Sequence, residues 1–266
     1  MRTAAGLAAF AALTCAACTG ASPSIPSAQP NAIPVHWSGP LARDFSALPR
    51  LTDTTPQALV VNGTLDAYDA FDSAGREDCL ADAVTNENIQ WSRKVAVPMT
   101  GPRFLTIVRA VSSYCGGAHG DERTIPVTFD LATGHMIDWS AWLPAGLAQP
   151  RYEPAAGWPQ MLRSPTLKAL YAERALASMD ALARSSCAEP LADETRASLL
   201  LWLDARGGGL GMRAEGFAYT DRICGVSVVL PVDELERLGT DPQVVEFLRL
   251  AMRDHLWRDQ PDAVGG

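Results

Sequence analysis

Residues 91–139 combine two features that together predict a meander of antiparallel strands: stretches rich in β-branched and aromatic residues, and short turns between them. Along the first stretch, polar and apolar residues alternate as in a strand with one buried face. Pro126, which has no N–H to donate, is expected to mark an edge of the sheet. The strands are predicted at residues 91–99, 104–114, 124–131 and 135–139.

The chain beyond the meander begins with helical signals. Ser164-Pro165 is expected to cap a helix of about five turns that ends before Cys187 and Pro190. One face of this helix carries an apolar stripe that is expected to pack on the core. The stripe consists of Leu167, Leu170, Tyr171, Leu176, Met179 and Leu182.

Turn residues and caps predict the remaining elements. Glycines at 207–209 separate the two arms of a second hairpin, Pro231 ends a further strand, and Asp241-Pro242 caps a last helix. The expected ranges are 199–204 and 210–219 for the hairpin, 223–230 for the strand, and 233–238 and 244–257 for two helices.

The segment before the meander gives mixed signals. Residues 59–65 predict a strand that ends at an Asn62-Gly63 turn, whereas residues 66–83 have helix-like spacing and leave their conformation open.

Along the chain as a whole, the predicted strands do not alternate singly with helices, so a parallel doubly wound sheet is not expected. The predicted class is α+β: an antiparallel meander sheet with a central helix, a second hairpin and a C-terminal helix.

The N-terminal residues have the composition of a bacterial export signal. Arg2 supplies a positive charge, and the apolar run after it is too short to span a bilayer core of about 30 Å. Ala16-Ala17-Cys18 resembles the end of a lipoprotein signal, after which Cys18 is lipidated; ordinary cleavage after Ala21 and a buried N-terminal helix are the alternatives. We expect a signal peptide at 1–17 and a flexible tether, rich in proline and serine, at 18–34.

The composition favours one folded domain with an acidic surface. Hydrophobic residues make up 47% of the chain, enough for a substantial core, and residues 35–258 are expected to form a single domain followed by a frayed tail at 259–266. The net charge of −8 argues against binding to nucleic acid and favours basic partners, unless it serves solubility alone.

Lipidation of Cys18 and loss of Cys15 would leave four cysteines for pairing: Cys79, Cys115, Cys187 and Cys224. Export to an oxidising compartment favours disulfides, and four cysteines allow three pairings. The local pairing, 79–115 with 187–224, encloses two loops of similar length, and Cys79 is the partner we expect for Cys115. The mature chain has neither a Cys-x-x-Cys nor a His-x₃-His pair, so no metal or cofactor is predicted.

Two motifs in the meander resemble those of a known family. Tyr114-Cys115-Gly116-Gly117-Ala118-His119 is followed by Phe129-Asp130-Leu131-Ala132-Thr133-Gly134 and then by Asp138-Trp139. This order resembles the extracytoplasmic domain shared by the lysozyme-sensing anti-sigma factor RsiV and the peptidoglycan deacetylase PdaC, in which a Gly-Gly-Ala-His turn precedes a strand ending in Asp-x-x-x-Gly.

Blocks at 200–204, 223–228 and 230–235 also resemble that family, so the resemblance spans about residues 57–240. The resemblance covers only the extracytoplasmic domain of those two proteins. It therefore implies neither the regulated proteolysis of the anti-sigma factor nor the deacetylation carried out by PdaC. The cysteines are not part of the family's common pattern.

His119 is the candidate for catalysis, as a general base oriented by a nearby carboxylate: Asp121, Glu122 or Asp130. We favour a structural role instead, with His119 held in the turn by a backbone hydrogen bond. The motif residues that mark a possible binding site are Gly116, Gly117 and His119. Asp66, Asp69 and Asp72 recur every three residues; we interpret them as a solvated helix face rather than a calcium site, because no glycine lies between them in a loop pattern.

The sequence therefore predicts a non-enzymatic cell-envelope binding protein, anchored to a membrane through lipidated Cys18 and recognising a basic, lysozyme-like protein or a peptidoglycan-related ligand. Two alternatives remain open. One is an envelope hydrolase that uses His119 with a nearby carboxylate, and the other is a purely structural envelope component.

Overall fold

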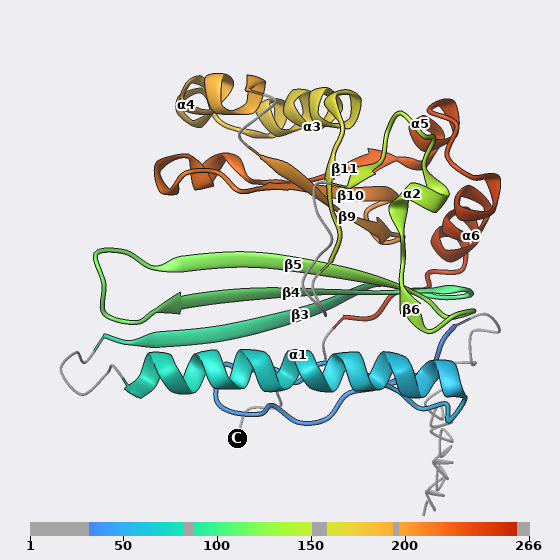
Figure 1. Cartoon of the computed structure of the whole chain (residues 1–266), viewed down its shortest axis with the longest axis horizontal. Coiled ribbons are helices and arrows are strands. Elements are labelled where there is room, and N and C mark those ends of the chain that lie inside the picture. Colours follow the sequence, from blue (N-terminus) through green and yellow to red (C-terminus); the bar gives the residue numbers. More distant parts are fainter. Residues whose placement is uncertain (1–31, 82–87, 151–158, 194–196, 260–266) are drawn as a thin grey trace, which may run out of the picture.

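The computed structural model describes residues 32–81, 88–150, 159–193 and 197–259. Its elements are stacked in layers (Figure 1): helix α1 lies under a four-stranded sheet, a five-stranded sheet lies above that, and helices α3 and α4 cover the top. All strand pairs within these sheets are antiparallel, which confirms the α+β class and the predicted meander.

The helices are α1 (Pro56–Ala81), α2 (Trp139–Trp142), α3 (Pro165–Ser178), α4 (Ala181–Ala192), the 3-10 helix η2 (Tyr219–Cys224), α5 (Val232–Arg237) and α6 (Pro242–Arg253). The strands are β1 (Val35–His36), β2 (Arg50–Leu51), β3 (Gln90–Thr100), β4 (Phe104–Tyr114), β5 (Asp121–Asp130), β6 (His135–Met136), β7 (Gln149–Pro150), β8 (Met161–Arg163), β9 (Ser198–Asp204), β10 (Gly209–Glu215) and β11 (Ser227–Pro231).

The lower layer consists of α1 and the meander, whose strand order is β3-β4-β5-β6. The β3–β4 register shifts between Ala96 and Met99, where Pro98 has no N–H to offer the ladder. Strand β6 pairs only with Phe129 and Asp130 of β5. Among the described strands, β5 therefore has no outer partner at Pro126, in agreement with the predicted edge.

Residues 59–65, predicted as a strand, instead form the first part of α1. Pro56 occupies the first helical position, where its missing N–H costs nothing. Asn62 makes no turn; its side chain exchanges two hydrogen bonds with the backbone of Leu51 in β2, at 2.9 and 3.0 Å. Helical spacing decides the conformation, because the side chains that face the meander recur every three or four residues: Ala58, Val61, Leu65 and Tyr68.

The interpretation of Asp66, Asp69 and Asp72 as a solvated helix face is wrong for two of the three. Only Asp66 keeps an exposed side chain, whereas Asp72 is 4% exposed and faces the meander. Its Oδ2 accepts hydrogen bonds from Arg93 (2.8 Å) and Arg109 (2.7 Å), and Asp69 also pairs with Arg93. Both arginines are fully buried, so this ion network forms part of the lower core.

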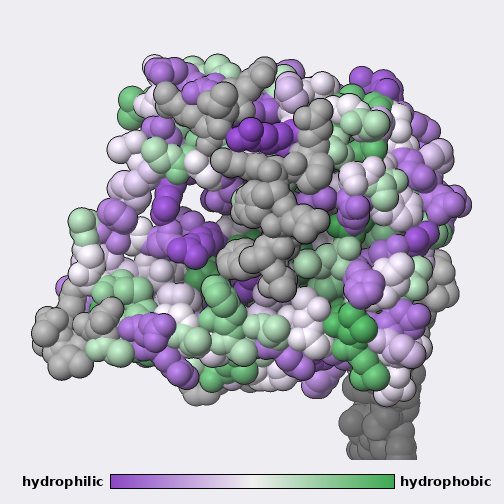
Figure 2. All heavy atoms as spheres, viewed as in Figure 1, coloured by the Kyte–Doolittle hydropathy of each residue, from purple (hydrophilic) through white to green (hydrophobic). Residues whose placement is uncertain are grey.

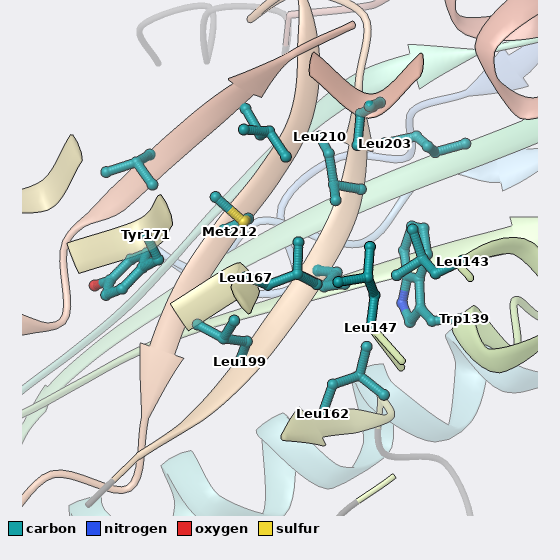
Figure 3. Close-up of a cluster of buried hydrophobic side chains, with 14 of the residues drawn as sticks. Trp139, Leu143, Leu147, Leu162, Leu167, Tyr171, Leu199, Leu203, Leu210 and Met212 are labelled. Atoms are coloured by element: carbon teal, nitrogen blue, oxygen red, sulfur yellow. The ribbon is translucent and has the colours of Figure 1, made fainter. Parts of the chain in front are cut away.

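The upper layer is built on the sheet β11-β10-β9-β8-β7. One face of β9 and β10 contributes leucines and a methionine to the upper core, and Figure 3 shows Leu203, Leu210 and Met212 in the same cluster as Leu167 and Tyr171 of α3. On the other face, the indole of Trp202 lies across Gly211, where a Cβ atom would come within 1.9 Å of the ring. Glycine at 211 is therefore required by this cross-strand contact.

The single long helix predicted after Ser164-Pro165 is interrupted. The Ser164 cap is confirmed, but α3 ends at Ser178 and Asp180 starts α4 by accepting a hydrogen bond from the Ala183 N–H (2.9 Å). Helix α4 then runs past Cys187 and contains Pro190. Because the break reorients the second helix, Leu182 is 80% exposed rather than part of the core stripe.

The strand predicted at 223–230 is shorter than expected. Tyr219–Cys224 forms η2, and β11 begins only at Ser227. The hydroxyl of buried Tyr171 in α3 lies 3.1 Å from the carbonyl oxygen of Cys224 and 2.9 Å from that of Val226. These contacts and the Cys224 disulfide bind this segment to α3 and α4 instead of to the sheet, and burial raises the pKa of Tyr171 to about 12.

The two layers meet at one end and separate toward the other. The hydroxyls of Thr106 and Thr128 lie 2.9 Å apart on the upper face of the meander, and that of Thr128 accepts a hydrogen bond from the Leu203 N–H of β9. Farther along the same face come Ser112 and Glu122, which are exposed. Figure 2 shows the surface hollowed between the layers on this side.

The predicted signal peptide, Cys18 and most of the predicted tether lie outside the described residues. Ile33, within the predicted tether, donates a backbone hydrogen bond to Thr100 of β3. At the other end, Arg206 pairs with Asp259, the first residue of the predicted tail. Among the described residues, no helix is both long enough and apolar enough to cross a membrane.

Candidate functional site

The first motif forms the turn between β4 and β5, at the left-hand end of the molecule in Figure 1. The Tyr114 hydroxyl donates a hydrogen bond to the Gly117 carbonyl (3.0 Å) and closes the turn. Gly116 has a φ of +90°, a conformation that L side chains rarely adopt, which explains the glycine. We use the name turn end for this turn (residues 115–120) together with η2.

Two disulfides hold the turn end, one on each side. Cys79 at the end of α1 is bonded to Cys115, and Cys187 of α4 is bonded to Cys224 at the end of η2. Their sequence separations are 36 and 37 residues, and the pairing is the local one. The expectation that Cys115 pairs with Cys79 is confirmed, and the bonds are those of a chain that folds in an oxidising, extracytoplasmic compartment.

The turn contacts η2 across the separation between the layers. The rings of His119 and Tyr219 are stacked, with centroids 3.6 Å apart and planes 23° from parallel. Below them, Asp121 pairs with Arg222 through one carboxylate oxygen and with Arg123 through the other. The lower and upper layers are therefore joined here by an aromatic stack and a carboxylate between two guanidinium groups.

His119 has the surroundings of a surface residue rather than of a general base. Its ring is exposed, and Nδ1 lies 3.2 Å from the carbonyl oxygen of the adjacent Gly120. The carboxylate that follows it, Asp121, is engaged by arginines. Among the described residues, the geometry supplies an exposed aromatic platform and no oriented acid–base pair at this ring.

Beside the turn end, a groove of about 440 Å³ runs between α1 and the meander. Phe71, Asp72 and Asp78 line it from α1, Trp91 lines it from β3, and Arg123 from β5. The Cys79–Cys115 disulfide also lines it, so the groove adjoins the motif turn. We call this feature the α1 groove.

The second motif lies at the opposite end of β5 and has a structural role. Asp130 accepts two hydrogen bonds from Arg103 (2.8 and 2.7 Å) and one from the Ala132 N–H (3.0 Å). Burial alone would raise the pKa of Asp130, but these bonds hold it below its ordinary value. Gly134, with φ of +77°, lies so close to Gln57 of α1 that a Cβ atom would come within 2.7 Å of its carbonyl oxygen.

Sequence reasoning found the turn but missed its partners. The predicted hairpin arm ends at Tyr219 and the predicted strand begins at Ile223, with Arg222 in neither. The sequence gives no sign that a segment 101 residues beyond Asp121 contacts it. The other histidines are scattered over β1, β6 and the turn after α6. Within the described ranges, no group of three or more His, Cys, Asp or Glu side chains is placed to hold a metal ion.

No protein-family model and no curated protein matches the chain. Among solved structures, the chain is similar to the crystal structure of a member of the DUF3298 family from Bacteroides fragilis, with 16% sequence identity, 73% of each chain covered and a TM-score of 0.37. An identity and a TM-score this low do not assign the chain to that family and carry no argument about its function.

Proposed function

We propose that this protein is a non-enzymatic, extracytoplasmic binding domain whose ligand contacts the turn end. The observation that carries the proposal is the pair of apolar side chains that η2 presents to solvent: Tyr219 is 50% exposed and Ile223 is 68% exposed. Large apolar side chains exposed on one short segment of a folded surface are typical of interaction sites.

The rigidity of this surface supports the same proposal. A ligand loses less affinity when the groups that bind it are already ordered, because ordering a side chain or loop opposes binding. Here the disulfide at Cys224 fixes the end of η2, the disulfide at Cys115 fixes the start of the turn, and the His119–Tyr219 stack orders the two rings together. The turn end is therefore ordered before any ligand arrives.

The ligand class follows from charge and from the resemblance of the motifs. A chain with a net charge of −8 attracts basic proteins over distances longer than direct contact. The extracytoplasmic domain that the motifs resemble belongs to proteins concerned with lysozyme and peptidoglycan. A lysozyme-like protein is accordingly the first ligand to test, and a peptidoglycan fragment is the second; anchoring through lipidated Cys18 would hold the domain near both.

The test uses purified mature protein immobilised on a biosensor, with lysozyme and soluble peptidoglycan fragments as analytes. We expect binding at micromolar concentrations or below, and at least about tenfold weaker binding by the double variant Tyr219→Ala/Ile223→Ser. Leu59→Ala is the matched control, since Leu59 is also exposed (60%) but lies near the opposite end of α1. Absence of binding to both analytes at micromolar concentrations would overturn the ligand class.

The same protein tests the non-enzymatic part of the proposal. Peptidoglycan incubated with the wild type should release no soluble products. Release that His119→Ala abolishes, while the melting temperature stays unchanged, would assign the protein to the hydrolases instead. A lower melting temperature without any wild-type turnover would agree with the stacking role of His119 against Tyr219.

A further inference from the structure

The α1 groove has aromatic and acidic walls that face each other. Phe71 of α1 is 53% exposed at the groove, and Trp91 of β3 lines it next to Gly75, where a Cβ atom would come within 3.2 Å of the indole ring. Because position 75 has no side chain, the indole can lie close against the helix. Asp72 and Asp78 of the same helix also line the groove.

Three aspartates and one arginine line the groove, and Asp78 carries its exposed negative charge, because Asp72 and Asp121 are each paired with two arginines. Arg123 is the cation among the lining residues, and its Nε is bonded to Asp121. Asp78 is exposed, and Asp72 receives both of its arginine contacts on a single oxygen, Oδ2. A groove that combines aromatic faces with carboxylates favours a ligand with a flat, delocalised positive charge.

The fold itself places two arginines in such surroundings a few ångströms away. The guanidinium of Arg93 lies 4.3 Å from the ring centroid of Phe45 and bonds to Asp72, and that of Arg109 lies 4.1 Å from the ring of Tyr68 and bonds to the same carboxylate. Each internal arginine therefore has one aromatic face and the Asp72 carboxylate, and Arg93 also pairs with Asp69. The α1 groove offers an aromatic face and a carboxylate at the surface.

We propose that the α1 groove binds an arginine side chain of a basic protein partner, with the guanidinium against Asp78 and its flat face toward Phe71 or Trp91. The proposal rests on the proposed binding function and adds a second contact region beside the turn end. Charge complementarity selects this occupant: the exposed Asp78 carboxylate beside aromatic side chains, in an acidic chain, favours a cation over a neutral glycan or an acidic peptide.

The test uses N-acetyl-arginine amide as probe and N-acetyl-citrulline amide, its uncharged analogue, as control. Binding is followed by NMR through the indole N–H resonance of Trp91, assigned with the variant Trp91→Phe. The arginine probe should produce a saturable shift of this resonance, and the citrulline probe should not. In Asp78→Asn the dissociation constant should rise about fivefold.

Glu77→Gln is the matched control variant, because Glu77 is the exposed neighbour of Asp78 on the same helix but does not line the groove. It should bind the arginine probe as the wild type does. Equal affinity of the two variants, or saturable binding of citrulline amide, would overturn the proposal. Both side chains are exposed on the same helix, so the two substitutions should affect the fold equally. A difference in affinity between the variants therefore reports on the groove.

This outcome is separable from that of the proposed function. If a basic partner binds the wild type and Asp78→Asn equally well, the groove proposal fails while binding at the turn end stands. If the arginine probe occupies the groove but no basic protein binds at micromolar concentrations, the groove chemistry stands while the proposed function fails.

Discussion

The lower and upper layers differ in how their helices pack on their sheets. In the upper layer, α3 and α5 pack on β10 and β11 mainly through aliphatic and aromatic side chains. In the lower layer, α1 meets the meander through an apolar half, which includes Val61 and Leu65, and through a buried ion network centred on Asp72. The two interfaces therefore depend on different interactions.

This difference bears on how each helix is positioned. Apolar contacts are non-directional, so many similar arrangements of a helix bury the same area. Hydrogen-bonded ion pairs have fixed geometry, and those from Arg93 and Arg109 to Asp72 fit only one rotation of α1 on the sheet. We infer that the network sets the orientation of α1, and with it the α1 groove, more than it adds to the free energy of folding.

The largest effect is expected from Asp72→Ala. It leaves two fully buried guanidinium groups without this carboxylate, and removing one partner of a buried ion pair typically costs about 3–5 kcal/mol. Urea unfolding at pH 7 measures the loss. Asp66→Ala is the control, because its side chain is 70% exposed and should cost less than about 1 kcal/mol. Similar values for both variants would contradict the claim that the lower interface depends on charge.

A somewhat smaller loss of unfolding free energy is expected when either disulfide is removed. With separations of 36 and 37 residues, the loop-entropy estimate is about 3–4 kcal/mol for either bond. The pair Cys187→Ala/Cys224→Ala should lose slightly more than Cys79→Ala/Cys115→Ala, because both of its sulfurs lie in the apolar upper core while Cys115 is partly exposed. Urea midpoints of the two double variants compare the layers directly, and a clearly larger loss in the lower layer would reverse the ranking.

The sequence predicts the meander well because its strands depend on local patterns. Alternation, β-branched residues and turn glycines locate β3, β4 and β5 to within a few residues. The start of α1 is missed because Val60, Val61 and the Asn62-Gly63 pair are typical of a strand and a turn, although tertiary contacts place them in a helix. The hydrogen bonds of Asn62 to Leu51 are invisible in the local pattern.

The candidate site likewise has features that local sequence patterns predict and features that depend on tertiary contacts. Gly116 and the cysteines are recognisable from spacing and compartment, since they depend on backbone geometry and redox chemistry. Tyr219 and Arg222 are not, because their positions at the turn depend on how the upper layer lies over the lower one. The buried state of Asp72 depends in turn on Arg93 and Arg109, which reach it from two separate strands.

The smallest expected effect is a difference between the two layers in how the stability contributed by a carboxylate depends on pH. In β9, burial raises the pKa of Asp204 above its ordinary value of 3.8, although hydrogen bonds from Gly207 and Trp202 oppose the shift. Its native state therefore holds the proton more tightly than the unfolded chain, so the stability that Asp204 contributes is present at low pH and is lost as the pH rises through the raised pKa. Asp130 in β5 has a lowered pKa, and its contribution is lost as the pH falls through that value.

Asp204→Asn and Asp130→Asn should therefore change the pH dependence of unfolding in opposite directions. In the wild type, ionisation of the buried Asp204 carboxyl lowers the stability of the fold. Asp204→Asn removes this group, so the stability of the variant relative to the wild type should improve as the pH rises above 3.8. Asp130→Asn loses the carboxylate that Arg103 binds, so its deficit should be largest near neutral pH and shrink in acid. Urea unfolding between about pH 3 and 7 measures both differences. If the two variants shift in the same direction, the pH response does not come from these carboxylates and the two layers do not differ in this respect.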